Sequence, residues 1–335
     1  MSRCLPRGHS RTWDNPSKGT NVVHYPEITA RPFERDRDLA DLYAFVSGTP
    51  TFAVHLADLP WRLASPSAQR RDRGQLWRDA DGAIVAWSIL QDEWACIDFA
   101  IRPDLRESAL GSDVVQWGVT CLEDDATYED DPLIRYASAH EHDRTGIALI
   151  EKAGFVRADW SYLHLGRDLR ASIESAIVPE GYQIRALAGI SEVDAYVIAH
   201  RDAFGSAAMT SEWRRATLDD PRYVADLDLV AIAPDGTIAG FCVTWITPLA
   251  SACSAERIAQ IEPFGVIPSR QRQGIGKALL IEAMRRARAM GATRLEVDTV
   301  SENDASRGAY AAAGFRELFE ARFFRRTFTA SSLVR

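Results

Sequence analysis

Cysteine, histidine and long apolar stretches are scarce in this chain of 335 residues. Its five cysteines are scattered, odd in number and without a CxxC pair: Cys4, Cys96, Cys121, Cys242 and Cys253. A disulfide framework is therefore not expected, and reduced thiols are typical of the cytoplasmic protein that we predict. No His, Cys and Asp cluster has metal-ligand spacing, so we expect no metal. No apolar run approaches the roughly 20 residues of a membrane-spanning helix, so we expect no membrane partner.

Positive charge is in deficit as well. The chain has 39 Lys and Arg against 47 Asp and Glu, for a formal net charge of −8. This balance disfavours nucleic acid or an anionic membrane surface as the main partner and favours a small molecule. Residues 1–24 include basic residues but no apolar stretch behind them, so we expect a disordered leader and not a secretory signal.

What the sequence does contain is a faint internal repeat. Residues 81–87 resemble 235–241, the loop 103–111 resembles 268–276, and residues 152–155 resemble 312–315. The three matches keep their order at a separation of roughly 160 residues, which indicates tandem copies of one domain. We therefore expect a first domain at 25–170 and a second at 181–330, with the boundary in 168–181.

Both copies show the same order of elements. Turn signals at 79–82 and 234–236 predict a β-hairpin in each copy. In the second copy we expect strands at 182–187, 229–233, 238–246, 257–266, 294–300 and 323–328, and helices at 191–204 and 276–290. The last strand of the first copy is expected at 161–165. Strands with interspersed helices indicate an α/β layer structure.

The most informative stretch is 266–278, where a strand is followed by a glycine-bearing turn and a helix. Gly274 and Gly276 allow the backbone to approach a ligand closely. The first amides of the helix point outward at the positive end of its dipole, and Arg270, Arg272 and Lys277 add charge. These features predict a site for a phosphate or pyrophosphate, unless the turn simply joins a strand to a helix.

Two common phosphate loops do not fit this stretch. A Walker A loop needs a glycine where Gln271 stands and Ser or Thr where Ala278 stands. A dinucleotide fingerprint needs a third glycine at Leu279. The remaining pattern, Gln271-x-x-Gly274-x-Gly276, resembles the Q/R-x-x-G-x-G/A loop of the GNAT acetyltransferase superfamily.

A second motif supports the same resemblance. Residues 303–315 resemble the GNAT pattern N-x-x-A-x-x-L-Y-x-x-x-G-F, with Asn303 and Tyr310 in place and Ser306 and Ala309 as small departures. The resemblance covers the second half of the chain and, more faintly, the first. It implies two tandem GNAT-type domains, each a mixed, mostly antiparallel central sheet flanked by helices. The layout resembles that of the mycothiol synthases, which also have two GNAT halves.

The resemblance also implies a cofactor and the residues that hold it. Acetyl-CoA is the implied co-substrate, with its pyrophosphate on the loop and its pantetheine beside the preceding strand. The residues implied to bind it are Phe264, Gly265, Val266, Gln271, Arg272, Gln273, Gly274, Ile275, Gly276, Lys277, Ala278, Asn303 and Ser306. A backbone amide near Val266 is implied to stabilise the oxyanion.

Acetyl transfer to an amine needs a base for the surplus proton and benefits from an acid for the leaving thiolate. Tyr310 is the expected acid, because a phenol with a pKa near 10 is protonated at neutral pH. Its alternative interpretation is a core residue with a satisfied hydroxyl. Glu262 is the expected base, since a partly desolvated carboxylate on this strand would have a raised pKa. A solvated glutamate or one that holds a substrate ammonium remain its alternatives, and Glu256 is a weaker candidate.

The first copy departs from the motif. Its loop, Arg106-Glu-Ser-Ala-Leu-Gly111, has Glu107 opposite Arg272, and Ile150 stands where the second copy has Tyr310. We therefore expect a degenerate, catalytically silent first domain. The predicted activity is transfer of an acetyl group to a primary amine of a small molecule by direct attack in a ternary complex. A non-catalytic coenzyme A sensor and a protein-amine acetyltransferase are the alternatives.

Overall fold

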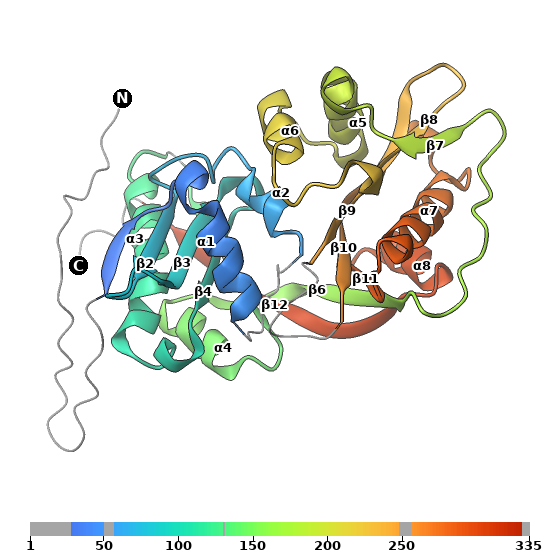
Figure 1. Ribbon diagram of the computed structural model, residues 1–335. Helices are drawn as coiled ribbons and strands as arrows, with labels where there is room; N and C mark the ends of the chain where they lie inside the picture. The colour runs from blue at the N-terminus through green and yellow to red at the C-terminus, as the bar shows by residue number, and fades with distance from the viewer. Residues whose placement is uncertain (1–27, 50–56, 130, 248–255, 330–335) are drawn as a thin grey trace, which may run out of the picture. The chain divides into compact units, whose positions relative to one another are not determined.

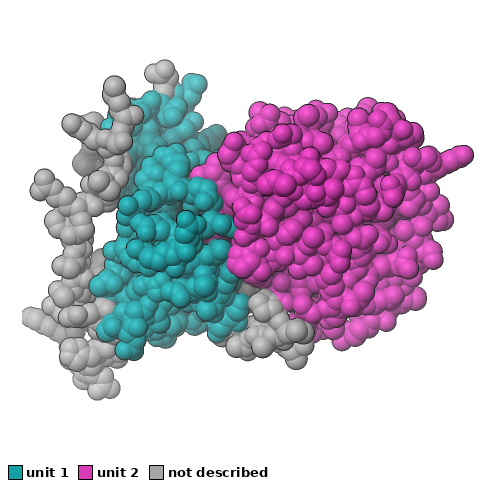
Figure 2. Space-filling view, turned by 45° about the horizontal axis from the view of Figure 1, so that its top comes forward, with its two compact units in different colours: residues 1–54, 67–159, 322–335 teal, residues 55–66, 160–321 magenta. Residues whose placement is uncertain are grey.

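The computed structural model describes residues 28–49, 57–129, 131–247 and 256–329, and the expected leader at 1–24 lies outside these ranges. The described chain forms two compact units, which Figure 2 colours separately. Unit 1 comprises Met1–Val54, Ser67–Asp159 and Arg322–Arg335, and unit 2 comprises His55–Pro66 and Trp160–Ala321. Neither unit is one contiguous segment of the chain.

Unit 1 contains one sheet whose order is β1-β2-β3-β4-β5-β12. The neighbours from β1 to β4 are antiparallel, and β4 and β5 are parallel. Its strands are β1 (Thr29–Pro32), β2 (Gly74–Arg78), β3 (Ile84–Gln91), β4 (Cys96–Ile101), β5 (Leu133–His140) and the end of β12 (Arg316–Phe328). Its helices are α1 (Arg35–Gly48), α3 (Ala109–Ala126) and α4 (Arg144–Lys152).

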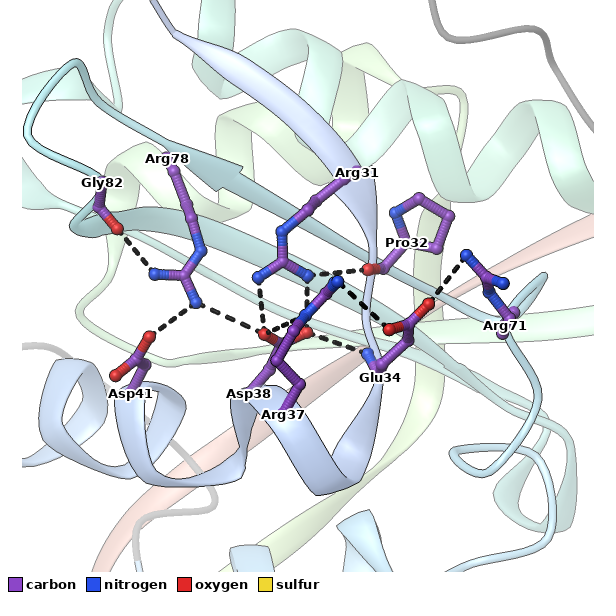
Figure 3. A network of polar contacts seen from close by, with 9 residues as sticks. All are labelled: Arg31, Pro32, Glu34, Arg37, Asp38, Asp41, Arg71, Arg78 and Gly82. Atoms are coloured by element: carbon purple, nitrogen blue, oxygen red, sulfur yellow. Dashed lines mark hydrogen bonds and ion pairs between the residues drawn. The ribbon is translucent and has the colours of Figure 1, made fainter.

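A network of charged side chains ties β1, α1 and β2 together in unit 1 (Figure 3). Asp38 of α1 is fully buried and accepts hydrogen bonds from both terminal nitrogens of Arg31, at 2.6 and 2.5 Å. Arg78 bridges Asp38 and Asp41. Burial alone would raise the pKa of the Asp38 carboxyl, but the hydrogen bonds from Arg31 and the Glu34 amide hold that pKa well below its usual range.

Unit 2 contains a sheet of order β6-β11-β10-β9-β8-β7 (Figure 1). Only β10 and β11 are parallel among its pairs with a recorded register. The strands are β6 (Val156–Asp168), β7 (Gln183–Ala186), β8 (Asp228–Ile232), β9 (Ile238–Ile246), β10 (Ile258–Val266) and β11 (Arg294–Val300). The helices are α2 (Leu59–Leu63), α5 (Val193–Phe204), α6 (Ser211–Leu218), α7 (Ile275–Ala289) and α8 (Asp304–Ala312).

The core of unit 2 lies between α7 and the central strands. All nine residues of β9 are buried, because a central strand covered on both faces needs a nearly continuous apolar run. The helix expected at 276–290 is confirmed as α7. Its residues Leu280, Ala283, Met284 and Ala287 recur at helical spacing and are buried in the core.

The strand expected to close the first copy, 161–165, belongs to β6 and pairs with β11 of unit 2, from Tyr162–Val300 to Asp168–Arg294. The strand expected at 323–328 is the end of β12 and belongs to unit 1. Each of these strands has 13 residues, long enough to pass from one compact unit into the other. The compact units and the sequence repeat thus divide the chain differently.

Candidate active site

The site is organised by a separation of β10 from β11. The parallel pairing of these strands runs from Ile258–Arg294 to Ile261–Val297, although β10 continues to Val266. On its other side β10 pairs with β9, with an irregularity between Ile261 and Phe264. The end of β10 is thus held by β9 alone among the pairs with a recorded register. Such a gap leaves backbone groups available to a ligand.

The predicted phosphate loop follows this strand and opens onto solvent. A short helical turn, Pro268–Arg270, precedes exposed residues at 271–274, and α7 begins at Ile275. Gly274 is the N-cap, with a φ of +90° that favours glycine and no side chain to cap the first amides of the helix. Built on Gly276, a Cβ would lie 3.3 Å from the Phe264 ring. The first turn of α7 is therefore free to bind an anion.

The cations of the loop differ in their partners. Arg270 pairs with Asp235 at 2.7 Å, and Lys277 pairs with Glu174 at 2.8 Å. Arg272 is exposed, has a φ of +64° and makes no ion pair with another described residue. Arg272 is therefore the loop cation that would not have to break an ion pair with a described residue to bind a phosphate.

The other residues implied to bind the cofactor surround the same strand and loop. Phe264, Gly265 and Val266 end β10, while Gln271, Arg272, Gln273 and Gly274 form the loop and Ile275, Gly276, Lys277 and Ala278 form the first turn of α7. Gln271 donates to the Val266 carbonyl, and Tyr182 donates to Gln273. Asn303 is the N-cap of α8 and accepts from the amide of Ser306 at 3.0 Å. Their roles as ligands remain predictions.

Tyr310 lies on α8 with its ring in the core. The ring is 6.0 Å from that of Phe264 and 5.6 Å from that of Phe315, and the side chain is 5% exposed. The hydroxyl has no hydrogen-bond partner among the described residues. Burial raises the pKa of this phenol far above its ordinary value, and Cys242 and Glu262 add to the rise. Tyr310 therefore keeps its proton and has a donor to offer.

Glu262 lies within the irregular segment of β10. The indole of Trp245 donates to its backbone carbonyl at 2.7 Å, which fixes the strand there. The side chain is surrounded by protein yet partly accessible, and its carboxyl has no hydrogen-bond partner among the described residues. Burial raises the pKa of Glu262 to about 8, Asp58 adds to the rise and Arg62 opposes it. This is not the environment of a solvated glutamate.

The weaker candidate, Glu256, has a different environment. It is partly exposed and forms ion pairs with Arg294 and with Arg170, the latter at 3.4 Å. Both pairs hold the Glu256 carboxylate at this position, so it would have to leave two arginines to reach a substrate. Glu262 therefore fits the role of base better than Glu256.

A buried histidine lies on β6, which is separated from β10 by β11. His164 of β6 contacts Asp298 at 2.5 Å and Glu296 at 2.8 Å, both on β11, and stacks on Phe319. Burial lowers the pKa of His164, but Asp298 and Glu296 outweigh that effect and raise it to about 10. The imidazolium thus balances two carboxylates, one of which, Asp298, also accepts from Gln260.

The sequence interpretation missed two charged residues near Glu262. Asp58 and Arg62 come from the first sequence repeat, but α2 belongs to unit 2 and brings them within electrostatic reach of Glu262. The sequence contains no signal for this placement, because the residues lie far from β10 along the chain and in no recognised motif.

The corresponding loop of unit 1 is closed. Arg106 donates to Asp143 at 2.5 Å, and Asp143 also caps α4 by accepting from the Gly146 amide. Built on Gly111, a Cβ would lie 2.0 Å from the Arg106 carbonyl oxygen, so the loop folds back onto the start of α3. Ile150 is fully buried. An internal carboxylate thus takes the arginine that a phosphate would need.

Within residues 28–49, 57–129, 131–247 and 256–329, no group of three or more His, Cys, Asp or Glu could hold a metal ion. In the same ranges, no helix is both long and apolar enough to cross a membrane.

The chain is similar in sequence to known acetyltransferases. Residues 193–315 match the model of the Acetyltransferase (GNAT) family. An aminoglycoside N(6')-acetyltransferase type 1 of Klebsiella aerogenes is 43% identical over 98 residues, which are 29% of this chain and 64% of that enzyme, slightly less than two thirds. A mycothiol acetyltransferase of Salinispora arenicola is 28% identical over 252 residues, which are 71% of this chain and 76% of that enzyme.

Solved structures extend the likeness to both halves. A tandem GNAT protein from the clavulanic acid biosynthesis pathway superposes with a TM-score of 0.61 at 15% identity, covering 90% of this chain and 98% of that one. A GCN5-related N-acetyltransferase from Sphaerobacter thermophilus gives 0.60 at 19% identity, covering 90% and 95%. At these identities the likeness shows the fold, which is that of tandem GNAT proteins. The sequence match over residues 193–315 is thus to one GNAT acetyltransferase domain, in a chain with the tandem GNAT fold.

Proposed function

We propose that this chain is an acetyl-CoA-dependent N-acetyltransferase that moves an acetyl group to a primary amine of a small molecule. The observation that carries the proposal is the grouping, in one unit, of an uncapped helix start, a separated strand pair, a protonated phenol and a carboxyl with a raised pKa. A phosphate loop alone would serve a binding protein, but Tyr310 and Glu262 supply the acid and base that acetyl transfer needs.

In the proposed complex, the loop 271–278 binds the pyrophosphate of acetyl-CoA. The pyrophosphate of acetyl-CoA would accept hydrogen bonds from the first amides of α7, next to Arg272. The pantetheine would follow the end of β10, where β11 no longer pairs with it. Acetyl-CoA, when bound, supplies an activated acetyl group as a thioester.

In the proposed reaction, Glu262 acts as the base and Tyr310 as the acid beside the end of β10. The amine attacks the thioester carbonyl, so that a C–N bond forms and the C–S bond breaks. Glu262 accepts the surplus amine proton, directly or through water, and Tyr310 donates its proton to the departing thiolate. A backbone amide near Val266 stabilises the negative charge on the carbonyl oxygen. Protons and electrons balance without another reactant.

A small-molecule acceptor is supported by the relatives. One is named for an aminoglycoside and several for mycothiol. We propose an acceptor of that general class, a small polar molecule with a primary amine, without choosing between these two. The raised pKa of Glu262 suits such an acceptor, because a base of that strength can take the proton of an ammonium ion.

The first test is titration calorimetry with acetyl-CoA on the wild type and on Gly274→Glu. The new side chain meets an unfavourable φ and sets a negative charge against the pyrophosphate, so binding should be lost. Gly189→Glu is the matched control, because Gly189 also has a positive φ, is surrounded by open space and lies outside the loop. No binding by the wild type would overturn the proposal.

Thiol release over a panel of primary amines then separates an enzyme from a sensor. An enzyme releases free thiol faster when its acceptor is present. If the protein binds acetyl-CoA and releases thiol with a peptide amine but with no small amine, a protein-amine acetyltransferase is favoured. Binding without release in any mixture would favour a coenzyme A sensor.

A further inference from the structure

α2 is a helix of five residues that belongs to unit 2 although it precedes β2 in the chain (Figure 1). Trp61 at its centre is 1% exposed, and its carbonyl accepts from the Trp213 indole at 3.2 Å. The Trp61 ring lies 5.3 Å from that of Trp213 and 6.0 Å from that of His200. The helix is therefore fixed against α5 and α6, not loosely placed on the surface.

A chain of aromatic rings connects α2 with the end of β10. The His200 ring stacks on Phe241 at 5.4 Å, and Phe241 pairs with Gly265 across β9 and β10. Built on Gly265, a Cβ would come within 2.7 Å of the Phe241 ring. The separated end of β10 is thus packed, through these rings, against the layer that holds α2.

α2 carries an ion pair in this layer. Asp58 and Arg62 approach to 3.4 Å, and their side chains are 2% and 6% exposed. Burying two opposite charges is costly, and a well-packed apolar pair would often be as stable or more so. A buried pair next to a site with a titratable carboxyl therefore invites a functional explanation.

The groups that interact electrostatically with Glu262 come from four elements. They are Asp58, the N-cap of α2, and Arg62 from α2, Asp298 from β11, Tyr196 from α5 and Tyr310 from α8. Asp298 is paired with the His164 imidazolium, which offsets its charge. Both phenols are neutral, because burial raises the pKa of each one. Among the charged groups, Asp58 and Arg62 therefore have the largest effects on the pKa of Glu262.

We propose that Asp58 and Arg62 are positioning residues for the acetyl transfer, which hold Glu262 as a base matched to an amine. This inference rests on the proposed function. The negative charge of Asp58 makes Glu262 a stronger base. The positive charge of Arg62 limits this effect, so that Glu262 can still ionise. The pair acts through Glu262 and does not contact the reacting atoms.

The two members of the pair act on Glu262 in opposite directions. Burial is the first cause of the raised pKa, Asp58 the second, and Arg62 opposes them. Removal of Asp58 should therefore lower the pKa of Glu262, while removal of the Arg62 charge should raise it. A merely structural pair would give two variants with the same phenotype, and opposite shifts separate the explanations.

The test is the pH dependence of kcat/KM for acetyl transfer. In the wild type, activity should rise with pH through about 8, as Glu262 ionises. We expect Asp58→Asn to move this limb to lower pH and Arg62→Met to move it to higher pH, each by about one unit. Arg62→Lys keeps the charge and should leave the limb in place. Glu262→Gln should remove the limb.

Glu192→Gln is the matched control for a lost carboxylate. Glu192 pairs with Arg185 in unit 2 and is not among the groups that interact electrostatically with Glu262, so this limb should not move. Shifts of the same sign in Asp58→Asn and Arg62→Met, or no shift in either, would overturn the inference. If Asp58→Asn does not fold, the contrast between Arg62→Met and Arg62→Lys decides.

A second readout does not depend on activity. The carboxyl of Glu262 can be titrated in the ligand-free protein by infrared difference against Glu262→Gln, for the wild type and both charge variants. If no amine is acetylated, the proposed function fails, and this titration still decides whether α2 controls Glu262. If transfer occurs and the titration does not move, the inference fails alone.

Discussion

At the scale of single residues, burial gives Tyr310 and Glu262 complementary properties. Loss of solvent disfavours the charged form of both groups, so each pKa rises. For the phenol this secures the proton that a departing thiolate needs. For the carboxyl it makes a stronger base whose pKa, about 8, lies close to the range in which an amine can be deprotonated. One physical cause thus serves an acid and a base.

Tyr310→Phe should slow turnover and leave cofactor binding unchanged. The variant keeps the ring against Phe264 and Phe315 and removes the only proton donor of the side chain. A general acid contributes about 10²- to 10⁴-fold, and a thiolate leaves fairly well unaided, so we expect kcat to fall by about 10²-fold. Steady-state kinetics and acetyl-CoA titration measure both quantities. An unchanged kcat would mean that Tyr310 is a core residue.

His164 shows a different use of a buried charge, because it joins β6 to β11 within unit 2. Its folded-state pKa, about 10, lies above the value near 6.5 of an unfolded histidine. A raised pKa contributes stability that is fully present below the unfolded value and is lost as pH rises through the folded value. The unit should therefore lose stability between about pH 7 and 10.

His164→Gln tests this linkage. The variant leaves Asp298 and Glu296 close together without the imidazolium, and breaking a buried pair costs about 3 kcal/mol. Urea unfolding at pH 7 should show that loss, and the difference between wild type and variant should shrink at pH 10.5. A difference that does not depend on pH would contradict the charge-based explanation.

At the scale of elements, the two corresponding strand–loop–helix regions differ in how accessible they are to an anion. In unit 2 the start of α7 has no side-chain cap, and its N-cap Gly274 is exposed. In unit 1 the Arg106 carbonyl lies over Gly111 and the Arg106 guanidinium is paired with Asp143. An anion entering the second loop meets free amides, whereas in the first it must displace a carboxylate.

We therefore expect one acetyl-CoA per chain. Calorimetric titration of the wild type should give a stoichiometry of one, and Gly274→Glu should abolish it entirely, because α3 of unit 1 offers no substitute site. Asp143→Asn is the informative companion, since it frees Arg106 while keeping the size of the side chain. Two equivalent sites in the wild type would show that the Arg106–Asp143 pair opens readily.

At the scale of the whole molecule, local pattern and long-range pairing explain what the sequence could and could not reveal. Helical periodicity predicted both ends of α7 to within one residue, because this pattern depends only on residues close together in the sequence. The second motif indicated Tyr310, and the strand before the loop indicated Glu262, which acts electrostatically on Tyr310. The pairing of β6 with β11 and the placement of α2 in unit 2 depend on contacts between distant segments. No local pattern records them, so Asp58 and Arg62 were missed.

This arrangement predicts that the second sequence repeat does not fold by itself. A fragment of residues 181–335 lacks β6, which pairs with β11 over seven positions, and lacks α2 and the core residues Leu165 and Leu169. It would expose the edge of β11 and part of the apolar core, so we expect aggregation and no cooperative thermal transition.

Co-expression with residues 1–180 is the decisive control for that fragment. The two pieces together supply every element of unit 2, so they should purify as a complex with a cooperative transition and bind acetyl-CoA. Circular dichroism and titration calorimetry distinguish the cases. If residues 181–335 alone unfold cooperatively and bind acetyl-CoA, the division expected from the repeat is sufficient for the site. In that case β6 and α2 would not be required for folding or for acetyl-CoA binding.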